Sequence, residues 1–183
     1  MNIYKLLKWG RSTLRIIKYK IKYNKQLRLD YSENTKPVYF GKNVKISIDK
    51  GCTLQIGGGT YLSDDCKIYV MDNSKCAVIG CHNYFGSSCR IMLRVPFKMG
   101  NDNLLADNIS IYDHNHNYEK NEGGFNSREI EMGSGCWLAT NVVVTAGTQI
   151  GDKVIVGANS VVGGHLNSNG VYVASRAKRI KEI

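Results

Sequence analysis

An apolar residue recurs at every sixth position over the C-terminal third of the chain, between residues 132 and 162. These positions are Met132, Leu138, Val144, Ile150, Val156 and Val162. The residue that follows each of them is small: Gly133, Ala139, Thr145, Gly151, Gly157 and Gly163. An amphipathic helix would instead repeat its apolar residues three and four positions apart. A period of six predicts a β-solenoid, in which short strands and bends alternate and the large apolar side chains fill the interior.

The same spacing occurs earlier in the chain, in sets separated by short insertions. The apolar positions are Phe40 and Ile46, then Ile56, Leu62 and Ile68, then Ile79, Phe85 and Ile91, then Met99, Leu105 and Ile111. We therefore expect an all-β solenoid over residues 40–173. Three hexapeptides per triangular coil give roughly six or seven coils.

A polar segment of about residues 112–131 interrupts the repeat. It contains Asp113, His114, Asn115 and His116, followed by a glycine pair. Polar insertions on a regular scaffold are where binding and catalytic residues usually lie. The segment is therefore expected to form a protruding loop that carries the function. From the residues alone, Asp113 is interpreted as a turn former, since an adjacent side chain rarely reaches its neighbour's ring well.

The first 30 residues predict a basic amphipathic helix, which a linker at 31–39 separates from the solenoid. At about 100° per residue, one side of this helix is apolar: Ile3, Leu7, Gly10, Leu14, Ile17 and Ile21. Nine Lys and Arg residues and no acidic residue lie within 1–28, whereas the whole chain has a net charge of +10. Such a helix suits an anionic membrane surface. The alternative is a helix docked on its own solenoid or on another subunit, and the sequence leaves both open.

The remaining composition narrows the class of protein. Outside the basic arm the net charge is about +1, because nine of the ten excess positive charges lie in 1–28, so nucleic acid is not an expected partner. The six cysteines form no C-x-x-C pair, which argues against zinc and redox motifs. Three of them, Cys66, Cys89 and Cys136, fall on the compact inward column of the repeat. No signal-peptide pattern opens the chain. We expect a reduced, cytoplasmic protein, and peripheral contact with the inner face of the membrane is one of the two roles open to the helix.

Three features of the chain resemble the hexapeptide-repeat acetyltransferases. They are the repeat IGDKVIVGANSVV at 150–162, Trp137 directly before the apolar repeat residue Leu138, and Tyr-Asp-His-Asn-His at 112–116. The similarity covers about residues 40–182 and points to the branch that acetylates sugars and surface polysaccharides. It implies a left-handed parallel β-helix and a homotrimer with active sites between subunits. It further implies transfer of acetyl from acetyl-CoA to a sugar hydroxyl of a capsule, exopolysaccharide or O-antigen, or of its lipid-linked precursor, with no acyl-enzyme and no metal.

The resemblance assigns His114 as the general base, a role that imidazole suits because its ordinary pKa lies near working pH. It places Trp137 at the border of the active site, where its ring would face the sugar or the pantetheine; the alternative is outward packing against a neighbouring subunit. His116 is a second candidate for the base or a substrate contact. Arg94 matches a position that holds sugar hydroxyls in galactoside-type enzymes, and Arg90 lies nearby. A planar cation there would suit an acidic sugar or a pyrophosphate carrier, and the alternative is that both are surface arginines. Thr140, Ala158, Lys178 and Lys181 are the expected contacts of coenzyme A. The basic tail, 174–183, departs from the usual ending of the family.

Other classes share the scaffold. A xenobiotic acetyltransferase of the chloramphenicol type uses a similar histidine and loop. A solenoid used only for binding or assembly would explain the repeat but leaves the histidine-containing loop without a role. A γ-carbonic anhydrase-like site needs three imidazoles around zinc, and His82 and His165 occupy no matching repeat positions.

Overall fold

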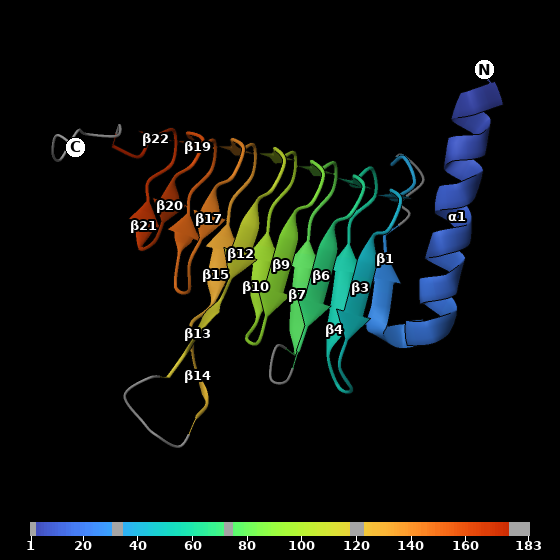
Figure 1. Ribbon diagram of the computed structural model, residues 1–183, viewed down its shortest axis with the longest axis horizontal. Coiled ribbons are helices and arrows are strands. Elements are labelled where there is room, and N and C mark those ends of the chain that lie inside the picture. Colours follow the sequence, from blue (N-terminus) through green and yellow to red (C-terminus); the bar gives the residue numbers. More distant parts are fainter. Residues whose placement is uncertain (1–2, 31–34, 72–74, 118–122, 176–183) are drawn as a thin grey trace, which may run out of the picture.

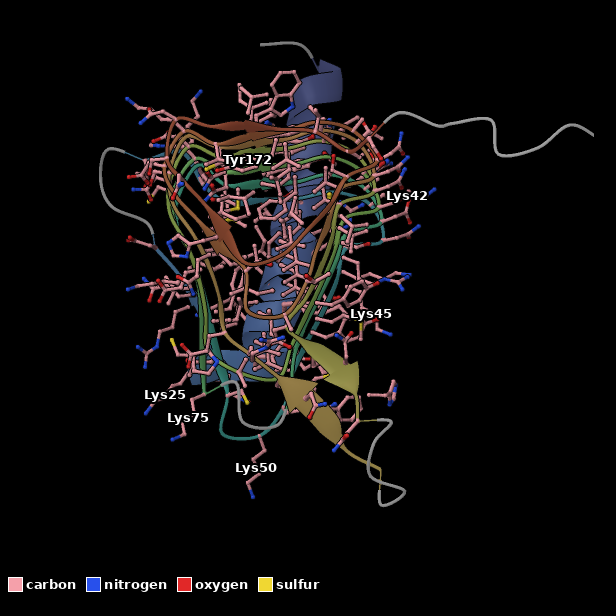
Figure 2. The ribbon with its side chains drawn as sticks, turned by 90° about the vertical axis from the view of Figure 1, so that its left-hand side faces the viewer. Lys25, Lys42, Lys45, Lys50, Lys75 and Tyr172 are labelled. Carbon is pink, nitrogen blue, oxygen red and sulfur yellow. The ribbon has the colours of Figure 1, made fainter. Side chains whose placement is uncertain are left out.

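The structure is a computed structural model that describes residues 3–30, 35–71, 75–117 and 123–175, with side chains from residue 7 onward. Short parallel strands stack into three sheets that form the faces of a triangular prism (Figures 1 and 2). The predicted parallel β-solenoid is therefore confirmed. One helix lies across the N-terminal end of the prism, and a hairpin projects from one of its corners (Figure 1).

Each coil contributes one strand to each sheet, except that the last described coil has no strand in the third sheet, and the strands are two to four residues long. The first sheet contains β1 (Leu27–Leu29), β4 (Thr53–Ile56), β7 (Cys76–Ile79), β10 (Phe97–Met99), β15 (Ile130–Met132), β18 (Gln149–Ile150) and β21 (His165–Leu166). The second contains β2 (Tyr39–Phe40), β5 (Tyr61–Leu62), β8 (Tyr84–Phe85), β11 (Leu104–Leu105), β16 (Trp137–Leu138), β19 (Ile155–Val156) and β22 (Val171–Tyr172). The third contains β3 (Lys45–Ile48), β6 (Lys67–Val70), β9 (Arg90–Leu93), β12 (Ser110–Tyr112), β17 (Val143–Val144) and β20 (Val161–Val162).

The six-residue anchors fill the interior of the prism, as the pattern predicts. Leu138 pairs with Leu105 on one side and Val156 on the other, and all three side chains are fully buried. Because equivalent residues of successive coils stack in register, the apolar interior is continuous along the prism. The compact inward column is also found, since Cys66, Cys89 and Cys136 are buried and free.

Small residues follow the anchors because the backbones of adjacent coils meet at the corners. A Cβ atom on Gly57 would lie 2.5 Å from the carbonyl carbon of Gly80, far inside van der Waals contact. A Cβ atom on Gly80 would likewise lie 2.5 Å from the carbonyl oxygen of Gly100 in the next coil. At these positions a side chain would push two coils apart.

Helix α1 (Ile3–Tyr23) covers the first coil and ends where Asn24 adopts a left-handed φ of 43°. The expected helix through residue 30 is therefore too long, since Leu27–Leu29 forms β1 and pairs with β4. The helix docks through a polar and aromatic side. The hydroxyl of Ser12 accepts a hydrogen bond from Phe40 N at 2.8 Å, and the Tyr23 hydroxyl donates to Ile46 O at 3.0 Å. No helix in the described part of the chain is long and apolar enough to cross a membrane.

Candidate active site at the hairpin corner

The segment predicted to protrude is a two-stranded hairpin between the third sheet and the first. Its antiparallel strands are β13 (His114–His116) and β14 (Phe125–Ser127), which pair His114 with Ser127 and His116 with Phe125. Figure 2, viewed along the prism from its C-terminal end, shows the hairpin leaving the lower corner, the side on which Lys50 also lies. Residues 118–122 of the predicted loop lie outside the described part.

Asp113 is a buried carboxylate at this corner with three hydrogen-bonding neighbours. It is fully buried, and its Oδ1 lies 2.8 Å from Nδ1 of His114. Its Oδ2 accepts hydrogen bonds from the backbone N–H groups of Arg94 at 2.7 Å and Val95 at 2.9 Å. The interpretation of Asp113 as a simple turn former is therefore wrong. The turn after β12 bends the backbone so that the adjacent side chains converge, which residue spacing cannot reveal.

This arrangement fixes the chemistry of the imidazole. An ionised carboxylate only accepts hydrogen bonds, so the proton of a neutral His114 lies on Nδ1. The lone pair is then on Nε2, where it can take a proton from an alcohol. The side chain of His114 is 11% exposed and that of Asp113 1% exposed, so water screens the pair weakly.

Phe125 organises the groups around the two histidines. Its ring meets the ring of His114 edge-on, with 5.2 Å between the centroids. It meets the ring of His116 at a tilt, with 4.7 Å between the centroids. The guanidinium carbon of Arg94 lies 3.5 Å from the Phe125 centroid. Three of the predicted site residues are thus brought together by a residue that the sequence reasoning missed. The register of the hairpin decides this contact, and no repeat or spacing in the sequence encodes it.

Arg90 belongs to the same sheet but lies away from this cluster. It begins β9, is exposed and pairs with Ser110, whereas Arg94 follows the end of that strand. Four residues of extended chain separate the two by about 13 Å. Only Arg94 contacts the aromatic ring beside the histidines.

The other predicted residues lie on different parts of the prism. Trp137 faces outward from the second sheet and is 46% exposed, whereas the hairpin leaves the corner between the third and first sheets. Thr140 and Ala158 occupy equivalent exposed turns of successive coils after the second sheet, where Asn159 N donates to Thr140 O at 3.0 Å. Lys178 and Lys181 lie outside the described residues. Within one chain, Thr140 and Ala158 are therefore on a different corner from His114.

A cavity of about 560 Å³ lies over the outer face of the first sheet. Its lining includes Lys98, Glu131, Gln149 and His165, which come from four successive strands. His114 is not among its lining residues. The described residues also contain no group of three or more His, Cys, Asp or Glu side chains that could hold a metal ion.

Comparisons with known proteins agree with this architecture. The profile of the bacterial transferase hexapeptide family (six repeats) matches residues 129–164. The chain is 38% identical over 96 residues to a putative lipopolysaccharide biosynthesis O-acetyltransferase, WbbJ, of Escherichia coli, a match that covers 46% of this chain and 49% of the relative. It is 28% identical over 146 residues to the putative colanic acid biosynthesis acetyltransferase WcaF of the same organism, covering 78% of this chain and 68% of the relative.

Among solved structures, a variant of AntD, an N-acyltransferase from Bacillus cereus in complex with a dTDP-linked amino sugar and coenzyme A, superimposes with a TM-score of 0.69. The two sequences are 15% identical, and the match covers 90% of this chain and 88% of that one. The likeness shows the fold, which is that of the left-handed parallel β-helix.

These findings place the chain among the hexapeptide-repeat proteins with a left-handed β-helix. The curated relatives that the chain matches are named as acetyltransferases of lipopolysaccharide and colanic acid biosynthesis, and these matches agree with the predicted family. It spans about half the length of the first curated relative that it matches.

Proposed function

We propose that the protein is an acetyl-CoA-dependent O-acetyltransferase that modifies a sugar hydroxyl of a surface polysaccharide or of its lipid-linked precursor. The Asp113–His114 pair carries this proposal. A buried carboxylate that holds an imidazole through Nδ1 leaves Nε2 as a base for an alcohol. The names of the relatives, a lipopolysaccharide and a colanic acid acetyltransferase, support a sugar acceptor.

In the proposed reaction, Nε2 of His114 removes the proton of the acceptor hydroxyl while its oxygen attacks the thioester carbonyl. The tetrahedral intermediate collapses by breaking the carbon–sulfur bond, and the imidazolium returns its proton to the thiolate of coenzyme A. The products are the acetyl ester and the free thiol, with no acyl-enzyme. Asp113 stabilises the positive charge that the imidazole carries between the two proton transfers.

We assign acceptor recognition to His116 and Arg94, which share the Phe125 ring with His114. A guanidinium that lies over an aromatic ring keeps a planar set of N–H donors suited to a carboxylate or phosphate. An acidic sugar or a phosphate-linked carrier therefore suits this position better than a neutral sugar. Arg90, exposed farther along the same sheet, would contact a more distant part of the same acceptor.

We further propose a homotrimer in which each active site lies between two subunits. The outer face of the second sheet carries a row of exposed apolar side chains in register: Tyr84, Leu104, Trp137, Ile155 and Val171. Such a row suits burial against another subunit. A neighbouring subunit could then bring Trp137, Thr140 and Ala158 towards His114, which resolves their separation within one chain. Lys178 and Lys181 would contact the phosphates of coenzyme A. We place the protein at the inner, cytoplasmic face of the membrane.

Acceptor screening tests the activity. The protein is incubated with acetyl-CoA and candidate sugars, nucleotide sugars and lipid-linked sugars, and mass spectrometry detects an added acetyl group. His114→Ala should lower the rate about 10²- to 10⁴-fold without unfolding the protein. If neither the protein nor the variant consumes acetyl-CoA with any acceptor, the chain is a binding module instead.

Mixing two inactive variants tests the shared site. His114→Ala and Trp137→Ala proteins are each assayed alone and after reassembly together. Mixed trimers should regain part of the activity, because some interfaces then contain an intact histidine and an intact tryptophan. If activity is absent from all mixtures while mixed trimers form, each site is confined to one subunit.

A further inference from the structure

The outward side of α1 carries an apolar row that no part of the described chain covers. Leu7 is 59% exposed, Leu14 68%, Ile17 47% and Ile21 79%. These residues lie on the side that the sequence predicts to be apolar, whereas the opposite side docks on the first coil through Ser12, Ile16, Tyr19 and Tyr23. The helix therefore closes the prism with one side and presents an apolar surface with the other.

A basic pocket of about 300 Å³ adjoins this row, between α1 and the first coils. Its lining contains four cationic side chains and one carboxylate, with Leu7 shared by the pocket and the row: Leu7, Lys8, Arg11, Arg15, Tyr39, Lys42 and Asp64. The ammonium of Lys8 lies 5.4 Å from the centroid of the Tyr39 ring. A hydrogen bond to Tyr61 raises the pKa of Lys8, which keeps this group charged.

The pocket has an excess of positive charge that its own residues do not neutralise. Asp64 already accepts a hydrogen bond from the backbone N–H of Lys42 at 2.7 Å. Arg15 uses its guanidinium on the carbonyl of Phe40 at 3.1 Å. Among the described residues, no ion pair joins Lys8, Arg11 or Lys42 to an acidic side chain. Like charges gathered in a concave site repel one another, and a bound anion relieves that repulsion.

We propose that this end of the prism docks on an anionic phospholipid membrane, with the apolar row in the interfacial layer and a lipid phosphate in the basic pocket. An apolar row bordered by cations is complementary to a surface of acyl chains and phosphates. The helix lies across the prism axis, so the whole row can meet a flat surface at once (Figure 1). This docking deepens the membrane contact in the proposed function by naming the residues and the headgroup chemistry.

The docked geometry also sets the height of the active site. The third sheet contains three strand spacings between β3 and β12, which precedes His114, or about 14 Å at about 4.8 Å each. One helix layer adds about 10 Å. The hairpin would then stand about 25 Å above the membrane surface.

Vesicle sedimentation tests the docking independently of catalysis. The full chain is mixed with vesicles of phosphatidylcholine, with or without phosphatidylglycerol, and the bound fraction is measured at low and high salt. Binding should require phosphatidylglycerol and fall as salt rises. Leu14→Gln with Ile21→Gln should weaken partitioning at least about tenfold, because two exposed aliphatic groups are lost. Arg11→Glu with Lys42→Glu should weaken it by a similar factor or more.

Two matched controls keep the test specific. Val161→Gln changes an equally exposed aliphatic residue, and Lys153→Glu reverses an exposed charge, both far from α1. Both should bind vesicles as the unaltered protein does. Equal binding to neutral vesicles, or no binding to either kind, overturns the proposal.

Two further outcomes would also overturn it. If inorganic phosphate or glycerol 3-phosphate binds the pocket in titration calorimetry while vesicles do not, the ligand is soluble. If the Leu14→Gln and Ile21→Gln changes lower the oligomeric mass measured in solution, the apolar row is an interface between copies of the chain. The catalytically inactive His114→Ala protein should still bind vesicles. Membrane docking is thereby tested independently of the proposed reaction.

Discussion

Replacing Asp113 by asparagine preserves the volume of the side chain but exchanges one acceptor oxygen for an NH₂ group. The carboxylate serves three donors: the ring nitrogen of His114 and the backbone N–H groups of Arg94 and Val95. The two N–H groups cannot change their role, and an amide NH₂ facing them would leave buried donors unsatisfied at about 1–3 kcal/mol each. The asparagine oxygen should therefore stay on the backbone, with its NH₂ turned to His114.

That orientation reverses the tautomer of the imidazole. Nδ1 must then accept a hydrogen bond, so the proton of neutral His114 moves to Nε2, which can no longer act as the base. We expect kcat to fall about 10²- to 10⁴-fold, the usual contribution of a general base. The loss of charge-assisted hydrogen bonds should lower the free energy of unfolding by about 1–3 kcal/mol.

The assay is thiol release from acetyl-CoA in the presence of the acceptor, with kcat and KM measured separately and unfolding followed by circular dichroism. Asp152→Asn is the matched control. Its exposed carboxylate also accepts a backbone hydrogen bond, from Ser134 N at 2.7 Å, but touches no histidine. It should keep its kcat. An Asp113→Asn protein that is folded and retains full activity would refute the argument that Asp113 positions the base.

Three further predictions concern the scaffold and the hairpin. Leu138→Ala removes a fully buried anchor and should cost about 2–5 kcal/mol in denaturant unfolding, whereas Val161→Ala, at a 70% exposed position, should change stability by less than about 0.5 kcal/mol. Gly57→Ala places a methyl group 2.5 Å from the backbone of Gly80 and should lower the unfolding midpoint by the equivalent of about 2 kcal/mol or more; an unchanged midpoint would mean that the coils separate freely. Phe125→Ala removes a partly exposed ring that contacts both hairpin histidines and should reduce kcat about tenfold with little loss of stability, which parallel kinetic and melting measurements would check.

Burial in the prism also affects the ionisation of particular side chains. Burial raises the pKa of Tyr39 to about 12, because the ring lies beneath α1 at the first coil. A phenol whose pKa is higher in the folded state than the usual 10 contributes stability below pH 10 that is lost as the pH rises towards 12. Burial likewise raises the pKa of the Cys136 thiol, so it should react slowly with alkylating reagents at neutral pH.

The sequence determined the solenoid because every coil obeys the same local rule. A large apolar residue enters the interior at six-residue intervals within each set, and over residues 132–162 a small residue follows each of them at the corner. Leu138, as an interior residue, and Gly133, as a corner residue, could therefore be assigned without coordinates. The apolar side of α1 was also predicted from the sequence, but the side that docks on the solenoid was not. Ser12, Tyr19 and Tyr23 dock the helix through hydrogen bonds, which hydrophobic periodicity does not reveal.

Only the tertiary structure decided how the candidate site is assembled. His114 could be selected from its residue type and its place before an insertion. The hydrogen bond between His114 and Asp113 depends on one bend of the backbone. The contact between His114 and Phe125, which are 11 residues apart in the sequence, depends on the register of the hairpin. The basic pocket beside α1 likewise joins residues of the helix to Lys42 and Asp64. A repeat specifies what is alike in every coil, whereas a site is built where the coils differ, and those differences acquire their geometry only when the chain is folded.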